Sequence, residues 1–345
     1  MKIVQILASS GGIGGLEQHT FNLCNQLALS EEVHVITHPC YAEYFNSAVH
    51  FHAVDMARSR WNWRLLWRLK RLVTVIQPDI IHAQAGKASE LIANIKMLFG
   101  CGQAKIICTI HGTKKNKKAY LKGDAVIAVS KALADGIPEE KAHIIYNGVY
   151  RQPESLIHEK KQLKQSIDLE FPDLDSNKKV VMCIGRLAPV KNIALLIQAM
   201  QGINANLWIV GEGVLHSTLE AQVQQLQLHD QVAFLGFRTD VGRLIQLADV
   251  VALSSDREGF PLVMVEALQA NKVMASTKVN GVIEWLPDAY LSEIGDVQDL
   301  HRAIQQALAE SAQLDFQHLF LRAKAELTVE AMAAQTLQVY QQQLN

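Results

Sequence analysis

The sequence contains no long apolar run and no paired cysteines, and each absence excludes a class of protein. No stretch approaches the roughly 18 consecutive apolar residues that a membrane-spanning helix needs. The opening stretch MKIVQILASSGG is interrupted by glycine too early for a signal peptide and is expected to form a first strand. No CxxC pair is present, which favours buried thiols in a reducing cytoplasm over disulfides or a metal site; the five cysteines are residues 24, 40, 101, 108 and 183.

Length and composition indicate a folded protein of two domains. The chain has 345 residues, of which 49% are hydrophobic and 19% charged. That balance is typical of ordered proteins, and domains of roughly 100–200 residues make two the expected number. The net charge of −1 conceals an asymmetry, because residues 1–150 carry +6 and residues 151–345 carry −7. The first half therefore suits a negatively charged neighbour.

Short β-rich runs alternate with helical patterns along both halves of the chain. This rhythm predicts parallel sheets with helices on both faces, in two Rossmann-like domains. In the first half the expected strands are residues 2–8, 33–37, 79–84, 104–110 and 125–130, with helices near 16–29, 60–76 and 88–98. In the second half they are residues 179–185, 205–211, 232–236, 250–255 and 272–277, with helices near 191–202, 213–227, 240–247 and 261–270.

The predicted domain boundaries follow from breaks in this rhythm. Residues 1–155 form the expected first domain and residues 179–325 the second. Between them, residues 156–178 are charged, contain Pro172 and show little periodicity, so they are interpreted as a linker region with a short helical stretch. Helices are expected from about residue 297 onwards.

The glycine-rich stretch SSGGIGGLEQH, residues 9–19, follows the first expected strand and opens a helix. Such a junction can hold phosphate on its backbone N–H groups. It is a poor dinucleotide fingerprint, because Glu17 stands where the third glycine of G-x-G-x-x-G belongs, and no acidic residue follows the second strand. A tight turn without a ligand is the alternative, and an NAD site is disfavoured.

The stretch GRLAPVKN, residues 185–192, follows the strand that opens the second domain. Arg186 and Lys191 flank a proline-containing turn that leads into a helix. Two cations beside a helix N-terminus are suited to a diphosphate, although a solvated turn is the alternative interpretation. A second strand–glycine–helix junction, IVGEGVLHSTL, contains Gly211.

The stretch DREGFPLVMVEAL, residues 256–268, places Glu258 before a Gly-Phe-Pro turn and Glu266 in the following helix. Pro261 suits the first helical position. The free amides of the turn favour an anion, and each carboxylate accepts two hydrogen bonds from vicinal sugar hydroxyls. The alternative is a surface N-cap and a solvated helical glutamate.

Taken in order, these motifs resemble the retaining glycosyltransferases of family 4, which have the GT-B fold. The series is GGIGGLE, HGT, VSKAL, IYNGV, GRLAPVKN, VGEG, FLGF and EGFPLVMVEAL, and it covers residues 3 to about 290. The resemblance implies an α/β protein of two Rossmann-like domains facing across a cleft. It also implies that residues 326–345 form a helix that returns to the first domain, which would be the acceptor domain.

The resemblance also implies roles for individual residues. Glu266 would bind the ribose of a nucleotide-sugar donor, Glu258 would bind the donor sugar, and Arg186 and Lys191 would neutralise the leaving diphosphate. His111, in HGT, would lie beside the donor sugar, although a histidine at a strand end is often structural. The other implied donor-binding residues are Gly14, Gly15, Gly211, Phe237, Arg238, Gly259, Phe260 and Leu262.

The implied reaction uses no metal and no cofactor. The one D-x-D motif, Asp173 to Asp175, lies in the linker region, so a metal-held diphosphate is not expected. Retention through front-face attack is carried over from the family. Two departures affect the expected sugar pocket: Asn271-Lys272 replaces a usual Gly-Pro, and Asn280-Gly281 replaces two glycines.

A basic, tryptophan-containing segment predicts the acceptor face. The stretch RSRWNWRLLWRLKRL, residues 58–72, is expected to form a helix that presents arginines and tryptophans on its outer stripes. Its expected buried stripe consists of Leu65, Leu69, Leu72 and Ile76. The alternative buries one or two of the tryptophans. Expected members of this face are Arg60, Trp63, Arg64, Trp67, Arg68, Arg71, Lys114, Lys115, Lys117 and Lys118. No recognition motif for nucleic acid accompanies the charge.

The sequence therefore predicts a metal-independent glycosyltransferase that uses a nucleotide sugar, with a UDP-sugar as the expected donor. The expected acceptor is lipid-linked or part of a lipopolysaccharide core, and the expected location is cytoplasmic, peripheral on the inner membrane. One alternative keeps the fold but uses a soluble acceptor. Another is a catalytically silent sugar-nucleotide sensor.

Overall fold

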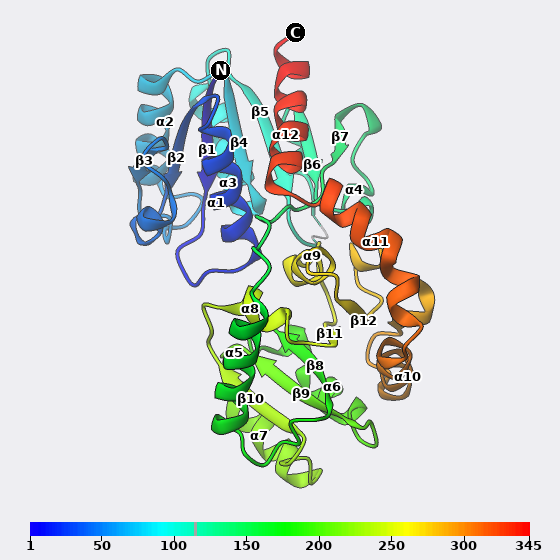
Figure 1. Cartoon of the computed structure of the whole chain (residues 1–345). Helices are drawn as coiled ribbons and strands as arrows, with labels where there is room; N and C mark the ends of the chain where they lie inside the picture. Colours follow the sequence, from blue (N-terminus) through cyan, green and yellow to red (C-terminus); the bar gives the residue numbers. More distant parts are fainter. Residues whose placement is uncertain (114–115) are drawn as a thin grey trace. The chain divides into compact units, whose positions relative to one another are not determined.

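The computed structural model describes residues 1–113 and 116–345, and the chain divides into two compact units. The first unit comprises Met1–Tyr150 and Glu326–Asn345, and the second comprises Arg151–Ala325. Each unit is an α/β fold with one parallel sheet (Figure 1). The fold class predicted from the alternating pattern is confirmed.

The first unit contains a seven-stranded sheet in the order β3-β2-β1-β4-β5-β6-β7, and all of its strand pairs are parallel. The central strands are almost wholly buried, as expected for a sheet that is covered on both faces. The strands are β1 (Lys2–Leu7), β2 (Glu32–Thr37), β3 (His50–Ala53), β4 (Ile80–Gln84), β5 (Lys105–Ile110), β6 (Ala125–Ala128) and β7 (Ala142–Ile144).

Helices cover both faces of this sheet. On one face, α1 packs beside α12 over a core that includes Ile3, Val35 and Ile107. Helix α3 covers the opposite face of the sheet, where it contacts β1, β4, β5 and α2. The residues of β1 that alternate with Ile3 point to that face and are buried as well. The helices are α1 (Gly15–Leu27), α2 (Trp63–Ile76), α3 (Ala85–Phe99), α4 (Lys131–Ala134) and α12 (Val329–Leu344).

The end of the chain is tied to the first unit by a close backbone contact. Val149 forms an isolated parallel bridge with Thr328, and its amide donates to the carbonyl of Leu327 at 3.1 Å. A Cβ at Gly148 would lie 2.1 Å from the carbonyl oxygen of Thr328. The glycine of the IYNGV motif is therefore required for the approach of the segment that leads into α12.

The second unit contains a six-stranded parallel sheet in the order β10-β9-β8-β11-β12-β13. This order places β8, the first strand of the unit, beside β11, so the direction of strand addition reverses between them. In doubly wound sheets ligands bind at the carboxyl ends of the strands near such a reversal. The strands are β8 (Lys179–Ile184), β9 (Ala205–Val210), β10 (Val232–Gly236), β11 (Val250–Leu253), β12 (Val273–Thr277) and β13 (Leu291–Ser292).

Helices of the second unit pack along its sheet. The amphipathic α10 contacts β11, β12, β13 and α6, while α9 contacts β12 and α8. The helices are α5 (Ile157–Glu170), α6 (Ile193–Ala199), α7 (His216–Gln225), α8 (Val241–Ile245), α9 (Leu262–Gln269), α10 (Val297–Leu308) and α11 (Ala312–Glu326). Among the described residues, no helix is both long and apolar enough to cross a membrane.

The structure differs from the sequence-based expectation in its shortest elements and in the linker region. The strands β3, β7 and β13 have only two to four residues each and were not predicted. Most of the expected linker region is α5, which has 14 residues. Only a short helical stretch was expected there from the sequence. The helix buries only Ile167, so its sequence carries little amphipathic pattern from which its full length could be predicted.

We expect Gly148→Ala to lower the free energy of unfolding by about 2 kcal/mol or more, because the backbone at Thr328 must move to admit the methyl group. Urea unfolding followed by tryptophan fluorescence measures the change. Gly11→Ala is the matched control, since a Cβ there meets no atom within 4 Å. Equal stability of the two variants would contradict this account of the contact.

Candidate active site

The loops that follow β8, β9 and β10 are joined by backbone hydrogen bonds at the carboxyl ends of these strands. The amide of Leu187 donates to the carbonyl of Glu212 at 2.9 Å, and the amide of Gly211 donates to the carbonyl of Gly236 at 2.8 Å. A Cβ at Gly211 would lie 2.1 Å from the carbonyl oxygen of Gly185, and one at Gly213 would lie 2.4 Å from that of Leu187. The VGEG motif is thus explained by backbone packing.

The two predicted cations lie on the loop after β8 and differ in their surroundings. Arg186 is exposed, and its guanidinium makes no hydrogen bond or ion pair with the residues that the structure describes. Lys191 ends a short 3-10 turn, Pro189–Lys191, and its Nζ lies 2.7 Å from Oε1 of Glu258. The structure therefore brings one of the two cations directly onto the first predicted glutamate.

Two donors hold one oxygen of the Glu258 carboxylate. Oε1 accepts a hydrogen bond from Ser255 Oγ at 2.7 Å, in addition to the contact with Lys191. Among the described residues, none donates to Oε2. The partly buried carboxylate is thus fixed through one oxygen, and the other is available to a ligand hydroxyl.

Contacts between the loops after β8 and β11 fix the position of Lys191. Its carbonyl accepts a hydrogen bond from Ser254 Oγ at 2.9 Å. The next residue, Asn192, has a left-handed backbone conformation, and its side-chain amide donates to Asp256 Oδ1 at 2.8 Å. These contacts link residues about 60 positions apart, and sequence patterns gave no signal for them.

The turn before α9 contributes its backbone to the site. The side chain of Phe260 is buried and packs edge-on against Trp285, with ring centroids 6.4 Å apart, so its ring faces the core. Gly259 is buried as well. A Cβ at Gly281 would lie 2.8 Å from the carbonyl oxygen of Gly259, and Gly281 has φ of +78°. The family usually has two glycines at positions 280 and 281. Gly281, the one that this chain keeps, is the one that the close approach of the Gly259 backbone requires.

Helix α9 begins one residue later than predicted. Pro261 has an extended conformation and is the N-cap, and Leu262 is the first helical residue. Helices leave their first N–H groups without intrahelical partners, so the start of α9 favours an anion. At its other end, Asn271 adopts a left-handed conformation with φ of 57° and takes the place of the usual glycine.

Glu266 is a partly buried carboxylate in the second turn of α9. It has no hydrogen-bond or ion-pair partner among the residues that the structure describes. Burial raises its pKa from the ordinary value of 4.5 to about 7. An unpaired carboxylate in such a position is costly unless a ligand supplies donors, and perturbed groups of this kind cluster at functional sites.

Two of the implied donor-binding residues, Phe237 and Arg238, follow β10. Phe237 is exposed. The guanidinium of Arg238 is committed to Asp240 through two hydrogen bonds of 2.8 Å, and this ion pair lowers the pKa of the Asp240 carboxyl. The Arg238 guanidinium is thus held in place by a side chain two residues further along the chain.

In the first unit, the glycine-rich stretch forms the loop before α1. The amide of Gly14 donates to Oε2 of Glu17 at 3.0 Å, which caps the helix. Glu17, the residue that breaks the dinucleotide fingerprint, thus has a structural role. Gly15 is the first residue of α1, and the Tyr41 hydroxyl holds the loop through a hydrogen bond to the carbonyl of Gly11 at 2.9 Å.

His111 follows β5 and is one end of a buried hydrogen-bond network. Its Nε2 lies 2.7 Å from Oε1 of Gln84, and Nε2 of Gln84 donates to Oε1 of Gln5 at 3.0 Å. Since the Gln84 oxygen faces the ring, Nε2 of His111 carries the proton and Nδ1 is an acceptor. Burial, together with the nearby His19 and His82, holds the pKa of His111 well below its ordinary value.

The same network continues to the last helix. Nε2 of Gln5 donates to the Tyr340 hydroxyl at 2.9 Å, and that hydroxyl lies 2.5 Å from Nδ1 of His82. Nε2 of His82 lies 2.5 Å from Thr109 Oγ1. Each group donates to the next, so all of these side chains are neutral. Sequence reasoning missed Gln5, His82 and Tyr340, because buried polar residues on separate elements share no local pattern.

His19 adds a second contact to His111. The two rings meet edge to face, with centroids 4.5 Å apart, and Nδ1 of His19 lies 2.9 Å from Oδ1 of Asn147. Burial lowers the pKa of His19 to about 4. His19 and Asn147 belong to stretches that the sequence analysis identified, GGIGGLEQH and IYNGV, although neither of these two residues was selected as a site residue.

The predicted basic face is centred on α2. Trp63 and Trp67 are 69% and 55% exposed, so the alternative that buries them is wrong. The Arg64 guanidinium lies over the Trp63 ring, and that of Arg71 lies over the Trp67 ring, at 5.5 and 5.7 Å from the centroids. The buried stripe also differs, because Leu66 and Val73 are buried whereas Leu72 is only partly so.

Several other cations of this face already have partners. Arg60 lies before α2 and pairs with Glu90, and Arg68 donates to the carbonyl of Ala53 at 2.8 Å. The Lys117 ammonium donates to the carbonyl of Leu133 at 2.8 Å and so has a local structural role. Lys118 is exposed, and the predictions for Lys114 and Lys115 lie outside the described residues.

The chain is similar in sequence and in fold to known glycosyltransferases. The N-acetyl-alpha-D-glucosaminyl L-malate synthase of Bacillus anthracis is 25% identical over 276 residues, which are 69% of this chain and 71% of that protein. The lipopolysaccharide core biosynthesis glycosyltransferase LpsD of Rhizobium meliloti is 24% identical over 89% of this chain and 88% of its own length. The structure of Anabaena HepE in complex with UDP-glucose superimposes with a TM-score of 0.83 at 20% identity, covering 99% of this chain and 100% of that one.

Two family models account for most of the sequence. Residues 13–152 match the model of glycosyltransferase family 4, and residues 165–318 match that of the group 1 glycosyl transferases. The matches follow one another along the chain in the order of the two units, and the fold agrees with that of the solved structures. The chain therefore belongs to the family 4 glycosyltransferases of the GT-B fold.

Proposed function

We propose that this glycosyltransferase moves a sugar from a nucleotide-diphosphate sugar, with UDP as the expected nucleotide, to a lipid-linked or lipopolysaccharide-core acceptor, with retention of configuration. The observation that carries the proposal is the unpaired Glu266 carboxylate in α9, the helix that begins four residues after the Glu258 of the Lys191–Glu258 pair. A partly buried carboxylate without a partner is matched by a diol that donates two hydrogen bonds. Ribose supplies such a diol.

The donor is expected to bind along the start of α9. Its ribose lies on Glu266, and its diphosphate meets the first amides of the helix and the free guanidinium of Arg186. A sugar hydroxyl donates to Oε2 of Glu258, whose other oxygen is held by Lys191 and Ser255. The complex of HepE with UDP-glucose supports the choice of nucleotide by similarity.

Departure of the nucleoside diphosphate requires stabilisation of the negative charge that develops on its oxygens. Three sources of positive charge supply this stabilisation without a metal ion: the side chain of Arg186, the side chain of Lys191 and the backbone amides before α9. Front-face attack, in which the leaving phosphate oxygen accepts the acceptor's proton, is the mechanism proposed for retention. It requires no enzymic nucleophile.

His111 is proposed to contact the donor sugar or the acceptor in its neutral form. Its Nε2–H is used by Gln84, so Nδ1 is the atom available to accept a hydrogen bond from a hydroxyl. Its low pKa excludes a cationic imidazolium near neutral pH. The ring thus orients a hydroxyl and does not stabilise the diphosphate.

The exposed face of α2 supports an acceptor at a membrane surface. Exposed tryptophans with arginines over their rings suit the interface of an anionic bilayer. The similarity to LpsD, which is named for lipopolysaccharide core synthesis, supports the same class of acceptor. We therefore propose peripheral attachment to the inner face of the cytoplasmic membrane.

A soluble acceptor is the second candidate, and one comparison favours it. The relative from Bacillus anthracis is named for N-acetyl-alpha-D-glucosaminyl L-malate, in which the sugar is joined to malate, a small acid. Vesicle binding separates the two candidates, since a soluble acceptor requires no bilayer. A silent sensor is disfavoured, because it has no need to retain both the Lys191–Glu258 pair and Glu266.

We expect one nucleoside diphosphate among UDP, GDP and ADP to raise the melting temperature, with UDP as the predicted one. At about 100 times Kd, binding adds roughly 2.7 kcal/mol, which corresponds to several degrees for a chain of this size. Glu266→Ala should abolish the shift because the ribose loses its acceptor, whereas Glu310→Ala, an exposed carboxylate before α11, should retain it. A wild-type chain that no nucleotide stabilises would contradict the proposed donor site.

Binding of UDP-glucose should weaken as pH falls through about 7, the pKa of Glu266. Protonation removes acceptor capacity from the carboxyl, so affinity is expected to fall about tenfold between pH 8 and pH 6. The diphosphate diester of UDP-glucose does not titrate in this range, unlike the terminal phosphate of UDP. Calorimetry on wild type and Glu266→Gln measures the effect, and an equal pH dependence in both would contradict it.

The double substitution Trp63→Ala and Trp67→Ala should reduce binding to anionic vesicles about tenfold or more, because two interfacial side chains are lost. Flotation with vesicles containing phosphatidylglycerol measures the bound fraction, and added salt should weaken the wild type. Leu29→Ala removes an exposed apolar side chain at the end of α1 and is the control. Unchanged flotation of the double variant would rule out this face.

A further inference from the structure

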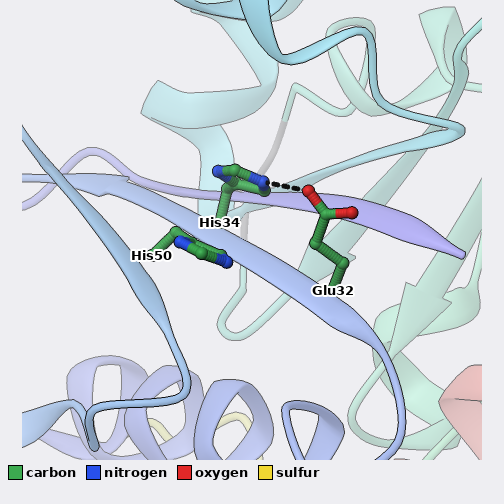
Figure 2. Close-up of side chains that lie close together, drawn as sticks. All are labelled: Glu32, His34 and His50. Atoms are coloured by element: carbon green, nitrogen blue, oxygen red, sulfur yellow. Dashed lines mark hydrogen bonds and ion pairs between the residues drawn. The ribbon is translucent and has the colours of Figure 1, made fainter.

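Three histidines and a glutamate gather at one edge of the first unit's sheet. They come from β2 and from the edge strand β3, whose parallel register pairs His34 with His50. Because side chains alternate along a strand, Glu32 and His34 share one face of β2, and His50 and His52 share the same face of β3. Figure 2 shows Glu32, His34 and His50 side by side.

Hydrogen bonds and ring stacking join these four side chains. Nε2 of His34 lies 3.0 Å from Oε1 of Glu32, and Nδ1 of His34 lies 2.9 Å from Nε2 of His52. The ring of His50 stacks on that of His34, with centroids 4.6 Å apart. One ligand atom from each of Glu32, His34 and His50 lies within 4.8 Å of the other two.

We infer that Glu32, His34 and His50 form a binding site for a divalent transition-metal ion of the zinc type. Two imidazoles and one carboxylate suit Zn²⁺, Ni²⁺ or Cu²⁺, whereas Mg²⁺ and Ca²⁺ prefer oxygen ligands throughout. Glu32 and His50 are exposed, so an ion reaches them from solvent and keeps a position for water. Among the described residues, no other group of three such side chains lies within these distances.

The adjustment required for binding is small. Bonds of about 2.0–2.1 Å in a tetrahedral site place ligand atoms roughly 3.3–3.5 Å apart, against the present limit of 4.8 Å. His50 is exposed and stacked flat on its neighbour, so its ring must turn about χ2, a torsion with a broad energy well. His34 is already fixed between Glu32 and His52.

His52 is assigned a supporting position. When Nε2 of His34 holds the ion, its Nδ1 carries the proton and donates to Nε2 of His52. Metal-bound histidines usually have such a partner for the second ring nitrogen, and the partner fixes the ring. His52 is thus a positioning residue for His34 and not a ligand.

A bound ion would join β3 to β2. β3 is a short edge strand, because it has only four residues and pairs with the sheet on one side alone. Glu32 and His50 are the first residues of their strands, so the ion lies at the amino edge of the sheet. His111 follows the carboxyl end of β5 at the opposite edge, and the proposed ion takes no part in sugar transfer.

The structure also contains a competitor for the ion. Nζ of Lys2, on the neighbouring strand β1, lies 3.3 Å from Oε1 of Glu32. This ammonium neutralises the carboxylate and repels a cation. Removal of the charge in Lys2→Gln should therefore tighten binding about three- to tenfold, an effect that a non-specific surface site would not show.

The test is calorimetric titration of the full, tag-free chain with ZnCl₂ after removal of metals with a chelator. We expect one Zn²⁺ per chain with micromolar affinity, a higher melting temperature with Zn²⁺, and no binding of Mg²⁺. His50→Asn should weaken Zn²⁺ binding tenfold or more. Because His50 is exposed, this substitution should leave the stability of the fold unchanged. His34→Gln should also weaken binding tenfold or more, and His52→Asn should weaken binding about tenfold.

The control is the double substitution His38→Asn and Cys40→Ser. Nδ1 of His38 lies 3.0 Å from Sγ of Cys40, and this exposed pair is another place where zinc can bind. The control should bind Zn²⁺ as the wild type does. Absence of wild-type binding at about 100 µM Zn²⁺, or binding that survives His50→Asn and is lost in the control, would overturn the inference.

Discussion

The return of the last helix to the first sheet is the constraint on which the rest of that unit depends. The Tyr340 hydroxyl accepts from Gln5 and faces Nδ1 of His82, so α12 completes a hydrogen-bond network that crosses β1, β4 and β5. Each buried group left unpaired would cost about 1–3 kcal/mol, and the network is therefore formed as a whole or not at all. Its other end is the contact between Gln84 and His111, so the segment farthest along the chain takes part in the network that holds the tautomer of His111.

The partly buried Glu266 carboxylate destabilises the folded second unit at neutral pH, and the proposed role in donor binding would explain why it is there. The folded chain binds the proton of this carboxyl more tightly than the unfolded chain, since its pKa is raised from 4.5 to about 7. The destabilisation is thus absent below pH 4.5, grows as pH rises to about 7, and is complete above it, on the order of 1–3 kcal/mol. Glu258 shows the opposite solution, because Lys191 and Ser255 already satisfy one of its oxygens. Neighbouring side chains hold the Glu258 carboxylate, whereas in the proposed function the donor supplies the hydrogen bonds to Glu266.

Regular elements were predictable from the sequence, whereas contacts between distant segments were not. Strand β10 was predicted at its observed bounds, and α9 began one residue after its predicted start, because apolar periodicity and turn residues are local signals. Helix α5 was taken for a linker because it buries almost nothing. The roles of Glu258 and Glu266 came from a resemblance to a family, while the Ser255 contact and the Tyr340–His82 pair, 258 positions apart, required coordinates. The four-residue strand β3 gave too short a pattern, and the histidine cluster was missed with it.

The two edges of a parallel sheet favour opposite charges, which explains why the two groups of functional residues differ in kind. Each crossover helix begins near the carboxyl end of one strand and ends near the amino end of the next. Helix N-termini, with their partial positive charge, therefore gather at the carboxyl edge, where α9 begins and where we propose that the diphosphate binds. Helix C-termini, with partial negative charge, gather at the amino edge; α1 ends at Leu27, five residues before Glu32. The backbone alone thus favours an anion at one edge and a metal cation at the other, and the side chains at each edge match that preference.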